Sequence, residues 1–368
     1  MGKIRYNQSM KKQLTILAIE SSCDETAAAV LSGSRYMLHD TGHSFKILSN
    51  CVSSQVQVHA KYGGVVPEVA ARLHIEKILP MIQLALKQAK KKIAEIDYIA
   101  VTAGPGLMSS LMIGTETAKT LALALNKQLI RINHIEGHLL SITEQLEFPA
   151  VGLVVSGGHT QIILVKDYLK YKLIGETRDD AAGEAFDKVA KILGLGYPGG
   201  PAISVAAAKV ESVKSIPGIE IKLPRPMLDK VGFEMSFSGL KTSVLYKWNE
   251  LVKILSPENL DKARNLMAYE FQKAVVEVLV AKTAAAALKF KAKTIVLGGG
   301  VSANKWLRSE MLRVISEKLP DVNVLMPEMK MAGDNAAMIA QAAYFHVLKK
   351  DFIEPTKLKP DPGWELVS

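Results

Sequence analysis

The sequence predicts an α/β protein with two related lobes, each a mixed sheet flanked by helices. Three observations support this fold class. Short apolar runs typical of strands alternate with stretches that have helical apolar spacing. Four of the apolar runs break abruptly into Gly, Ser, Thr and Asp. The runs that begin at Leu14 and Val151 start fresh segments about half a chain apart, so we expect two similar lobes that face each other.

Composition limits the class of protein. The chain has 368 residues, which is too long for one ordinary core, and 48% hydrophobic with 22% charged residues excludes a disordered or fibrous chain. Lys and Arg exceed Asp and Glu by 46 to 36, a net charge of +10 that favours an anionic partner. Cys23 and Cys51 are the only cysteines, which excludes a disulfide framework and a four-thiolate zinc site.

The sequence also predicts the cellular compartment of the protein. No apolar stretch approaches the roughly 18 residues that a spanning helix needs, and the opening MGKIRYNQSMKK lacks the apolar core of a secretory signal. We therefore expect no membrane association and a cytoplasmic location. A mitochondrial location is the less favoured alternative, because the opening is basic and free of acidic residues.

The expected strands and helices follow from periodicity. The predicted strands and the turns that follow them are Leu14–Ile19 before ESSCDET, Tyr98–Thr102 before AGPGLMSS, Val151–Val155 before SGGHT and Thr294–Leu297 before GGGVSAN. The predicted helices include His74–Ala89, Gly114–Leu125 and Met267–Phe290. The predicted domains are a basic tail at 1–12, lobe I at 13–133 plus 328–350, lobe II at 134–327 and a loose C-terminal tail at 351–368.

Two further segments have no regular period. Residues 215–239 are rich in Pro and Gly and predict a long ordered loop or an excursion over a site. Residues 35–50 look like an insertion, and we interpret His39 and His43 within it as solvated polar residues in a hairpin-like stretch.

Two glycine-rich turns are candidates for binding phosphate. A small-residue turn after a buried strand brings backbone N–H groups together, and a following helix adds its positive dipole end. SGGHT and GGGVSAN both have this form, although either could simply be a tight turn. Neither matches a Walker or dinucleotide-binding pattern. Together with the acidic ESSCDET turn, they resemble the nucleotide cleft between the lobes of the actin, Hsp70 and sugar-kinase superfamily.

His134 and His138 are four residues apart in NHIEGHLL, which on a helix places both imidazoles on one face at metal-ligand spacing. Glu136 lies about 200° round the same helix from His134, so a zinc-protease mechanism is disfavoured. Asp334 in MAGDNAAMIA is a candidate third ligand, although an Asp before a helix is also a common N-cap. Two imidazoles and one carboxylate suit a single Fe(II) ion, with Zn as the alternative.

Ten ordered motifs carry a more specific resemblance. They are ESSCDET, KYGGVVPEVAARLH, TAGPGLMSSLMIG, HIEGH, VSGGHTQ, DDAAGEAFDKVAK, YPGGP, FSGLKT, GGGVSAN and GDNAAMIA. From about Leu14 to Tyr344 the chain resembles the tRNA N6-adenosine threonylcarbamoyltransferase family, once named O-sialoglycoprotein endopeptidases. The resemblance implies a two-lobed actin-like ATPase fold. It also implies transfer of a threonylcarbamoyl group from threonylcarbamoyl-AMP to N6 of the adenosine beside the anticodon of ANN-reading tRNAs.

The resemblance implies roles for individual residues. It assigns metal ligation to His134, His138 and Asp334, and places Asp24 and Glu25, as candidate catalytic carboxylates, in the same cleft. An adenylate or ATP-type nucleotide is expected to contact Val154, Val155, Ser156, Gly157, Gly158, Asp187, Gly200 and Asn304, with Lys241 also lining the cleft. His159 is a further candidate base.

Three positions depart from the family pattern. They are Asn133 where many members have a further histidine, Glu234 and Met235 where Asp-Phe is common, and Ala336 where Gly is usual. None removes an expected ligand. Asn133 leaves the supporting role of the extra histidine in doubt.

The family implies tRNA as a partner and accessory subunits, which in bacteria include a paralogue of the same fold and a small P-loop ATPase. A cluster formed by Lys87, Lys90, Lys91 and Lys92 could contact tRNA, but a solvated helix end is the simpler interpretation. The alternatives from other function classes are a metallopeptidase, an ATP-dependent small-molecule kinase and a non-catalytic nucleotide-binding scaffold.

Overall fold

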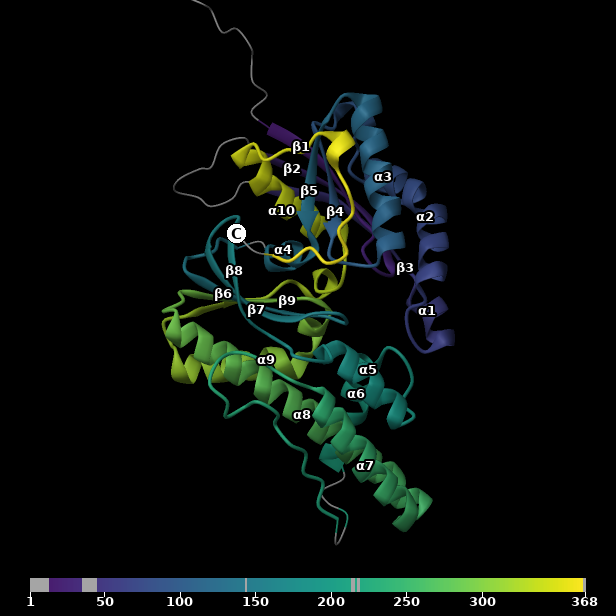
Figure 1. Ribbon diagram of the computed structural model, residues 1–368, viewed down its shortest axis with the longest axis vertical. Helices are drawn as coiled ribbons and strands as arrows, with labels where there is room; N and C mark the ends of the chain where they lie inside the picture. The colour runs from purple at the N-terminus through teal and green to yellow at the C-terminus, as the bar shows by residue number, and fades with distance from the viewer. Residues whose placement is uncertain (1–12, 35–44, 143, 213–215, 217–218, 367–368) are drawn as a thin grey trace, which may run out of the picture.

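The computed structural model describes residues 13–34, 45–142, 144–212, 216 and 219–366, and these form two five-stranded sheets stacked along the long axis (Figure 1). The first sheet contains β1 Gln13–Glu20, β2 Glu25–Ser34, β3 Phe45–Ser54, β4 Tyr98–Gly104 and β5 Gln128–Asn133. The second contains β6 Ala150–Val155, β7 Thr160–Asp167, β8 Lys170–Glu176, β9 Thr294–Gly298 and β10 Asn323–Leu325.

The two sheets have the same topology. Their orders are β3-β2-β1-β4-β5 and β8-β7-β6-β9-β10. In each sheet the first three strands form an antiparallel meander, and the last two strands run parallel to the first. This repetition confirms the prediction of two related α/β lobes.

Helices separate and cover the sheets. They are α1 Val56–His59, α2 Pro67–Gln88, α3 Met108–Leu125, α4 His134–Leu139, α5 Ala182–Ile192, α6 Gly199–Ala208, α7 Ser238–Ile254, α8 Pro257–Lys289, α9 Lys305–Lys318 and α10 Ala336–Lys349. Short 3-10 turns occur at η1 Ala60–Tyr62, η2 Ile93–Glu95, η3 Lys209–Ser212, η4 Gly300–Ala303, η5 Met329–Met331 and η6 Pro355–Lys357.

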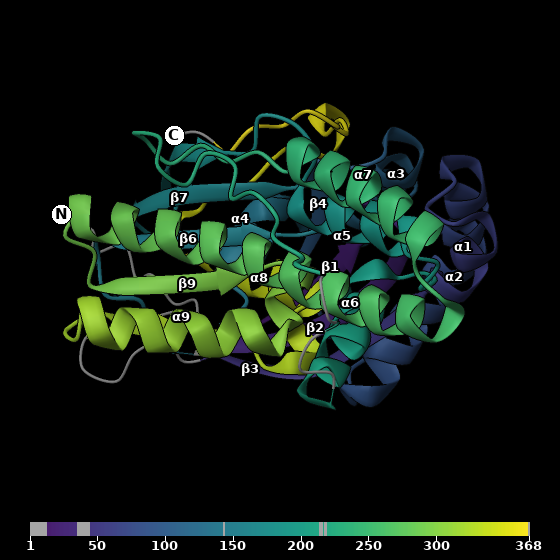
Figure 2. The same cartoon turned by 90° about the horizontal axis from the view of Figure 1, so that it is seen from below.

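Strand alternation divides the interior into three apolar clusters. Along β1, Leu17 and Ile19 face the α2 and α3 side, whereas Leu14 and Ile16 face a middle layer that contains α4 and α10. The opposite face of the second sheet packs against α5 to α9, and α8 and α9 lie side by side there (Figure 2). The middle layer therefore joins the two sheets.

The chain passes between the two sheets twice. It leaves β5 of the first sheet through α4 and returns from β10 of the second sheet through residues 326–335 into α10. The helix α10 then packs on β1 and β2, far from it in sequence. Two connections thus meet in the middle layer.

The predicted elements are all present, and their bounds differ for identifiable reasons. The helix predicted at His74–Ala89 begins at Pro67, and the one predicted at Met267–Phe290 begins at Pro257. Both prolines stand at the first helical position, where the missing N–H costs nothing. The apolar pattern of both helices is weak in their first turns, because these turns are largely exposed.

Two predictions about irregular segments need correction or refinement. The C-terminal segment is not a loose tail, because residues 353–366 pack along the first sheet, with Leu358 fully buried. The excursion at 215–239 is ordered where the structure describes it and packs on α8 through ion pairs of Arg225 with Glu270 and Glu277. The basic opening and the histidines His39 and His43 lie outside the described residues.

The described part of the chain contains no helix that is both long and apolar enough to cross a membrane.

Candidate functional site

The helix α4 starts where β5 ends, and it carries a histidine pair into the middle layer. Asn133 is its N-cap, accepting a hydrogen bond from the N–H of Ile135 at 2.9 Å. His134 and His138 lie on one face, as their spacing predicts, with ring centroids 4.6 Å apart. Both rings are buried.

Asp334 meets this pair from the second connection between the sheets. Its Oδ1 lies 3.5 Å from Nε2 of His134 and 3.1 Å from Nε2 of His138. The candidate ligand atoms of the three residues all lie within 4.8 Å of one another. Asp334 is not the helix cap, because Asn335 fills that role for α10. The expected triad is therefore assembled from segments about 200 residues apart.

The residues present fit a divalent cation. His138 is fully buried, yet neither of its ring nitrogens makes a hydrogen bond with any residue that the structure describes, and the Asp334 oxygen 3.1 Å from Nε2 is an ion-pair contact. A buried nitrogen left without a partner costs free energy unless another group engages it. Two imidazoles and a carboxylate form a ligand set suited to Fe(II) or Zn.

The charges of the triad are strongly coupled. Burial lowers the pKa of His134, but the carboxylates of Asp334 and Glu20 outweigh it and raise that pKa to about 9. Burial and the neighbouring His134 lower the pKa of His138. Burial opposes ionisation of Asp334, but both imidazoles hold its pKa below the usual range. The site therefore favours an ionised carboxylate beside positive charge.

Glu20 supports the triad from behind, and the sequence analysis missed it. It is the fully buried last residue of β1, and its Oε2 lies 3.2 Å from Nδ1 of His134. The hydroxyl of Thr102 donates to the same oxygen at 2.5 Å. A carboxylate at Nδ1 fixes the tautomer that leaves Nε2 free for a metal. A charged residue that ends an otherwise apolar strand was the available signal.

Beside the triad, the glycine-rich GGGVSAN turn lies very close to neighbouring main-chain atoms. A Cβ on Gly298 would lie 2.6 Å from the carbonyl oxygen of His138, and one on Gly299 would lie 2.4 Å from that of Val155. Gly299 also has a φ of +85°, which favours glycine. The GGGVSAN turn therefore packs directly on the histidine helix, and it leads through η4 into α9 as expected.

The SGGHT turn differs from the prediction. The chain continues from β6 directly into β7 as an antiparallel hairpin, so no helix follows the turn in sequence. The helix N-terminus beside the turn belongs to α5 instead, where the N–H of Gly183 donates to the Ser156 carbonyl at 3.2 Å. Short small-residue turns suit hairpins and strand-to-helix connections equally, which is why the sequence did not distinguish them.

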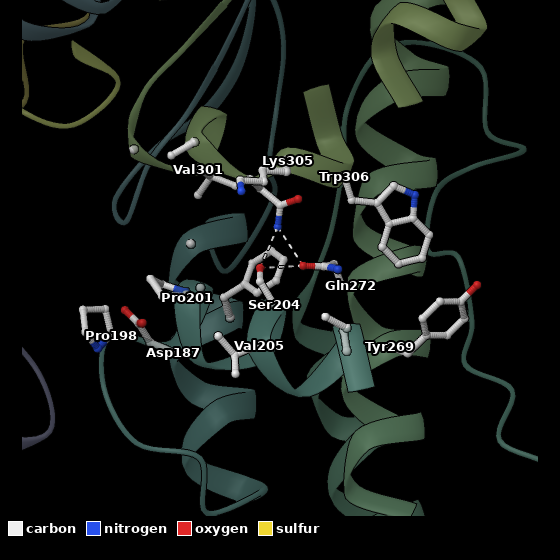
Figure 3. A pocket seen from close by; sticks show the side chains of 18 of the residues that line it. Asp187, Pro198, Pro201, Ser204, Val205, Tyr269, Gln272, Val301, Lys305 and Trp306 are labelled. Carbon is white, nitrogen blue, oxygen red and sulfur yellow. Dashed lines mark hydrogen bonds between the residues drawn. The ribbon is translucent and has the colours of Figure 1, made fainter. Parts of the chain in front are cut away.

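A cavity of about 1210 Å³ opens between α5, α6, α8 and the start of α9. Four expected nucleotide contacts line it, namely Gly157, Asp187, Gly200 and Asn304. The other contributors are mainly apolar, including Val205, Tyr269 and Trp306, whose positions Figure 3 shows. A largely apolar cavity with a few polar groups is typical of a small-molecule site.

Hydrogen bonds hold the polar side chains that line the cavity in place. The Nδ2 of Asn304 donates to Gln272 at 2.8 Å and to Ser204 at 3.2 Å, and Ser204 donates to Gln272 at 2.7 Å (Figure 3). Asn304 also caps α9 through its Oδ1. Asp187 accepts from the N–H of Gly199 at 2.7 Å, and burial raises its pKa. Sequence patterns do not predict four further lining residues, because ordinary helix residues carry no motif; they are Ser204, Gln272, Tyr269 and Trp306.

The remaining candidates for nucleotide contact are not among the residues that line this cavity. Val154, Val155 and Ser156 are buried at the end of β6, and Gly158 is exposed in the hairpin. Lys241 is half-buried and pairs with Asp180 at 3.1 Å; it does not line the cavity.

Asp24 and Glu25 stand at the turn between β1 and β2, and Glu25 interacts electrostatically with both Asp24 and Asp334. Burial and the Asp24 carboxylate raise the pKa of Glu25 well above its usual value. His159 is also close to the triad, and burial and the two imidazoles lower its pKa to about 4. Its ring is therefore neutral at pH 7.

The carboxylate of Glu136 makes its polar contacts away from the triad. Its carboxylate accepts from the hydroxyl of Tyr171 at 2.8 Å and lies 3.0 Å from Nε2 of His346. This confirms the prediction that Glu136 cannot act as the base of a zinc-protease helix. The residue instead ties α4 to β8 and α10.

Known structures with the same arrangement support the fold. HypF from T. kodakarensis superposes with a TM-score of 0.56 at 13% identity, over 93% of this chain and 48% of that chain. Full-length HypF in a phosphate- and nucleotide-bound form gives 0.53 at 14% identity, over 94% of this chain and 57% of that one. Together with the two mixed sheets, they confirm the predicted two-lobed α/β fold, in which each lobe is a mixed sheet flanked by helices.

Sequence comparison identifies the family. The model of the tRNA N6-adenosine threonylcarbamoyltransferase family matches residues 46–341. The enzyme of that name from Syntrophomonas wolfei is 46% identical over 351 residues, 95% of this chain and 96% of the relative. The one from Kosmotoga olearia is 44% identical over 359 residues, 96% of this chain and all of the relative. The chain therefore belongs to the tRNA N6-adenosine threonylcarbamoyltransferase family of transferases.

Proposed function

We propose that this protein transfers the threonylcarbamoyl group of threonylcarbamoyl-AMP to N6 of the adenosine 3′ of the anticodon in ANN-reading tRNAs, with assistance from one divalent metal ion. Fe(II) is the favoured ion and Zn the alternative, because the ligand set combines two imidazoles with one carboxylate. The observation that carries this proposal is the contact between the triad helix and the glycine turn, which brings a candidate metal site and a candidate adenylate site together.

The donor would lie across the two sites. The adenylate base would occupy the apolar part of the cavity near Tyr269 and Trp306, with the Asp187 carboxylate as a hydrogen-bond acceptor. Backbone N–H groups of the two glycine turns would face the phosphate, as the expected contacts at 154–158 require. Lys241 would act from the edge of the cleft and not on the nucleotide itself, since Asp180 engages it.

The residues that would hold the metal are His134, His138 and Asp334, with Glu20 fixing the His134 ring. A divalent ion bound there supplies Lewis-acid polarisation of a donor oxygen. The buried triad excludes water from one side of that position. Orientation and electrostatics then account for most of the rate acceleration, because the mixed anhydride is already activated.

The reaction needs no covalent enzyme intermediate. The N6 lone pair forms a bond to the carbamoyl carbon, the bond from that carbon to the phosphate oxygen breaks, and AMP leaves with the electron pair. N6 loses one proton. We propose that the pair formed by Asp24 and Glu25 accepts this proton, because the two residues are adjacent at the turn between β1 and β2, and burial and the Asp24 carboxylate raise the pKa of Glu25. His159, neutral at pH 7, is the alternative acceptor.

We also propose a protein partner for the outer face of α2. Ile75 and Leu79 lie one turn apart on this helix and are 65% and 55% exposed. Exposed apolar residues at this spacing favour a helix-lined interface with an accessory subunit. The basic cluster at Lys87 and 90–92 lies at the C-terminal end of the same helix, where a solvated helix end remains the simpler interpretation.

The decisive experiment is a transfer assay. Purified protein is incubated with threonylcarbamoyl-AMP and unmodified ANN-reading tRNA, with and without accessory subunits, and the tRNA is digested for mass spectrometry of threonylcarbamoyladenosine. We expect the product only on tRNA with the adenosine in place. Wild-type protein stripped of metal serves as the control for metal assistance.

Three results would each contradict one part of these proposals. Absence of the modified nucleoside under every partner combination would exclude the transfer itself. Full activity of rigorously metal-free protein would leave the transfer intact and remove the metal from it. An Ile75→Asp, Leu79→Asp variant that retained partner-dependent activity would exclude the interface on α2.

A further inference from the structure

The C-terminal segment of the chain follows the open edge of the first sheet. The N–H of Ile353 donates to the carbonyl of Leu129 on β5 at 2.9 Å, which covers an otherwise free strand edge. The 3-10 turn η6 then packs against α3, and Leu358 is fully buried in the cluster beneath it. In Figure 1 this yellow segment descends past β4 and crosses in front of α4. We call residues 353–366 the C-terminal strap.

The strap next contacts the turn between β4 and α3. The N–H of Asp361 donates to the carbonyl of Ala103 at 2.7 Å, and the N–H of Gly106 donates to the carbonyl of Pro362 at 3.3 Å. The approach at Gly104 is so close that a Cβ there would lie 1.8 Å from the Asp361 carbonyl oxygen. The fit between strap and turn therefore requires this glycine.

The strap ends at the residue that caps the histidine helix. The Nδ2 of Asn133 donates to the main-chain carbonyl of Trp364 at 3.0 Å, while its Oδ1 caps α4. Asn133 is 1% exposed. The guanidinium of Arg131 lies 5.0 Å from the Trp364 ring centroid, and Leu366 packs against the middle layer. One side chain thus links the strap to the start of α4.

A second route reaches the same histidine. The turn that the strap contacts continues to Leu107, whose N–H donates to the Ser22 carbonyl at 2.8 Å. The hydroxyl of Ser22 lies 3.2 Å from Nδ1 of His134. The strap therefore braces His134 from its backbone, through Asn133, and from its ring, through Ser22.

We propose that the C-terminal strap is a positioning element of the metal site and that Asn133 is the residue through which it acts. The inference rests on the proposed function for the role of the metal. A six-residue helix is too short to be stable alone, so the position of its ligands depends on the contacts that anchor the helix. Glu136 anchors one side of α4, and the strap anchors its N-terminus.

The test separates capping from anchoring in the full-length protein. Asn133→Asp keeps an oxygen that can cap α4 but, when ionised, has no donor for the Trp364 carbonyl. Asn133→Ser also keeps a capping oxygen, and its shorter side chain removes the amide group that reaches Trp364. Trp364→Ala loosens the strap without changing Asn133. We measure amide hydrogen exchange at residues 135–139 in metal-free protein, and the Kd for Co²⁺ by competition with a chelator.

We expect all three variants to speed exchange in α4 by about fivefold, the effect of one lost hydrogen bond. We expect the Kd for Co²⁺ to rise by about tenfold, as for other losses of support around a metal ligand. Asp179→Asn keeps the Oδ1 acceptor but replaces Oδ2, which accepts from the hydroxyls of Ser236 and Ser238 at the start of α7. It is the matched control for general destabilisation and should change neither quantity.

Wild-type exchange in α4 in both Asn133 variants would overturn the proposal. So would an equal effect of Asp179→Asn, since this would indicate general loosening of the fold. If the wild-type protein binds no Co²⁺, the proposed metal role fails, and exchange in the metal-free variants still decides the role of the strap.

Discussion

His138 is fully buried, and within the described ranges neither of its ring nitrogens makes a hydrogen bond, so packing alone does not account for it. We expect His138→Ala to abolish stoichiometric binding of a divalent metal and to reduce transfer more than about a hundredfold, because one of three ligands is lost. Metal content by mass spectrometry and nucleoside analysis measure the two effects.

The control for this prediction is His346→Gln, because His346 is not a candidate ligand and the Gln amide keeps a donor for the Glu136 carboxylate that His346 contacts. It should retain one bound ion per chain. A His138→Ala protein that still bound metal at full stoichiometry would show that the ion, if present, sits elsewhere.

A substitution at Glu20 tests whether its carboxylate supports the His134 ring. Glu20→Gln keeps the size of the side chain but removes the negative charge beside Nδ1 of His134, so we expect metal affinity to fall by about 10-fold to 100-fold. Chelator competition measures it. An unchanged affinity would mean that the hydroxyl of Ser22 is sufficient to orient the ring.

The sequence predicted these residues unevenly. The spacing of His134 and His138 predicted their shared helix face, and the geometry agrees. Their juxtaposition with Asp334 came from family resemblance, because no periodicity relates residues about 200 positions apart. Glu20 was missed, since its role depends on the ends of β1, β4 and α4 meeting in space.

At the scale of elements, the start of α7 depends on Asp179 from another segment. Its carboxylate accepts from the N–H groups of Phe237 and Ser238 and from two serine hydroxyls. Burial opposes ionisation, but these hydrogen bonds outweigh it and lower the pKa of Asp179. An ionised side chain at a helix N-terminus is also favoured by the helix dipole.

We expect Asp179→Asn to lower the free energy of unfolding at pH 7 by about 1 kcal/mol, a value already reduced for solvent screening of this exposed group. Because the folded pKa is lowered, the stabilisation is present above the unfolded pKa of about 4 and is lost as pH falls through the folded value. Urea unfolding at pH 7 and at progressively lower pH measures it. A wild-type to variant difference that stayed constant down to pH 3 would contradict this prediction.

Elements were predicted well where the pattern was long and poorly where it was short. The apolar spacing of α8 was sufficient to place a long helix. The five residues of SGGHT were not sufficient to distinguish a hairpin from a strand-to-helix turn, so the helix beside it was assigned wrongly. Tertiary contact with α5 decides that geometry, and the local sequence does not contain it.

At the scale of the molecule, the cavity between α5, α6, α8 and α9 should couple ligand binding to stability. Ligand at 100 times its Kd adds about 2.7 kcal/mol to the free energy of unfolding. A Cβ on Gly200 would contact no other atom within 4 Å, so Gly200→Val should fold normally and project into the cavity.

We therefore expect AMP to raise the Tm of the wild-type protein and to leave that of Gly200→Val unchanged. Gly239→Ala serves as the matched control, since a Cβ there also meets no neighbour and Gly239 does not line the cavity. An equal AMP-induced shift in Gly200→Val would exclude this cavity as the adenylate site.

Two apolar runs that begin about half a chain apart were enough to predict two lobes. The matching strand orders of the two sheets agree with that prediction. The lobe boundaries at 133/134 and 327/328 stay predictions. The route of the C-terminal strap could not be predicted, because its contacts are mostly main-chain hydrogen bonds that leave no side-chain pattern.

The two passages of the chain between the sheets set an order of events during translation. All strands of the second sheet leave the ribosome before α10, the helix that completes the layer beneath β1 and β2. The C-terminal half of the nascent chain can therefore fold while the N-terminal half still waits for its last helix. Asp334 emerges about 200 residues after His138, so a nascent polypeptide completes the candidate metal triad only after every strand of the second sheet has been synthesised.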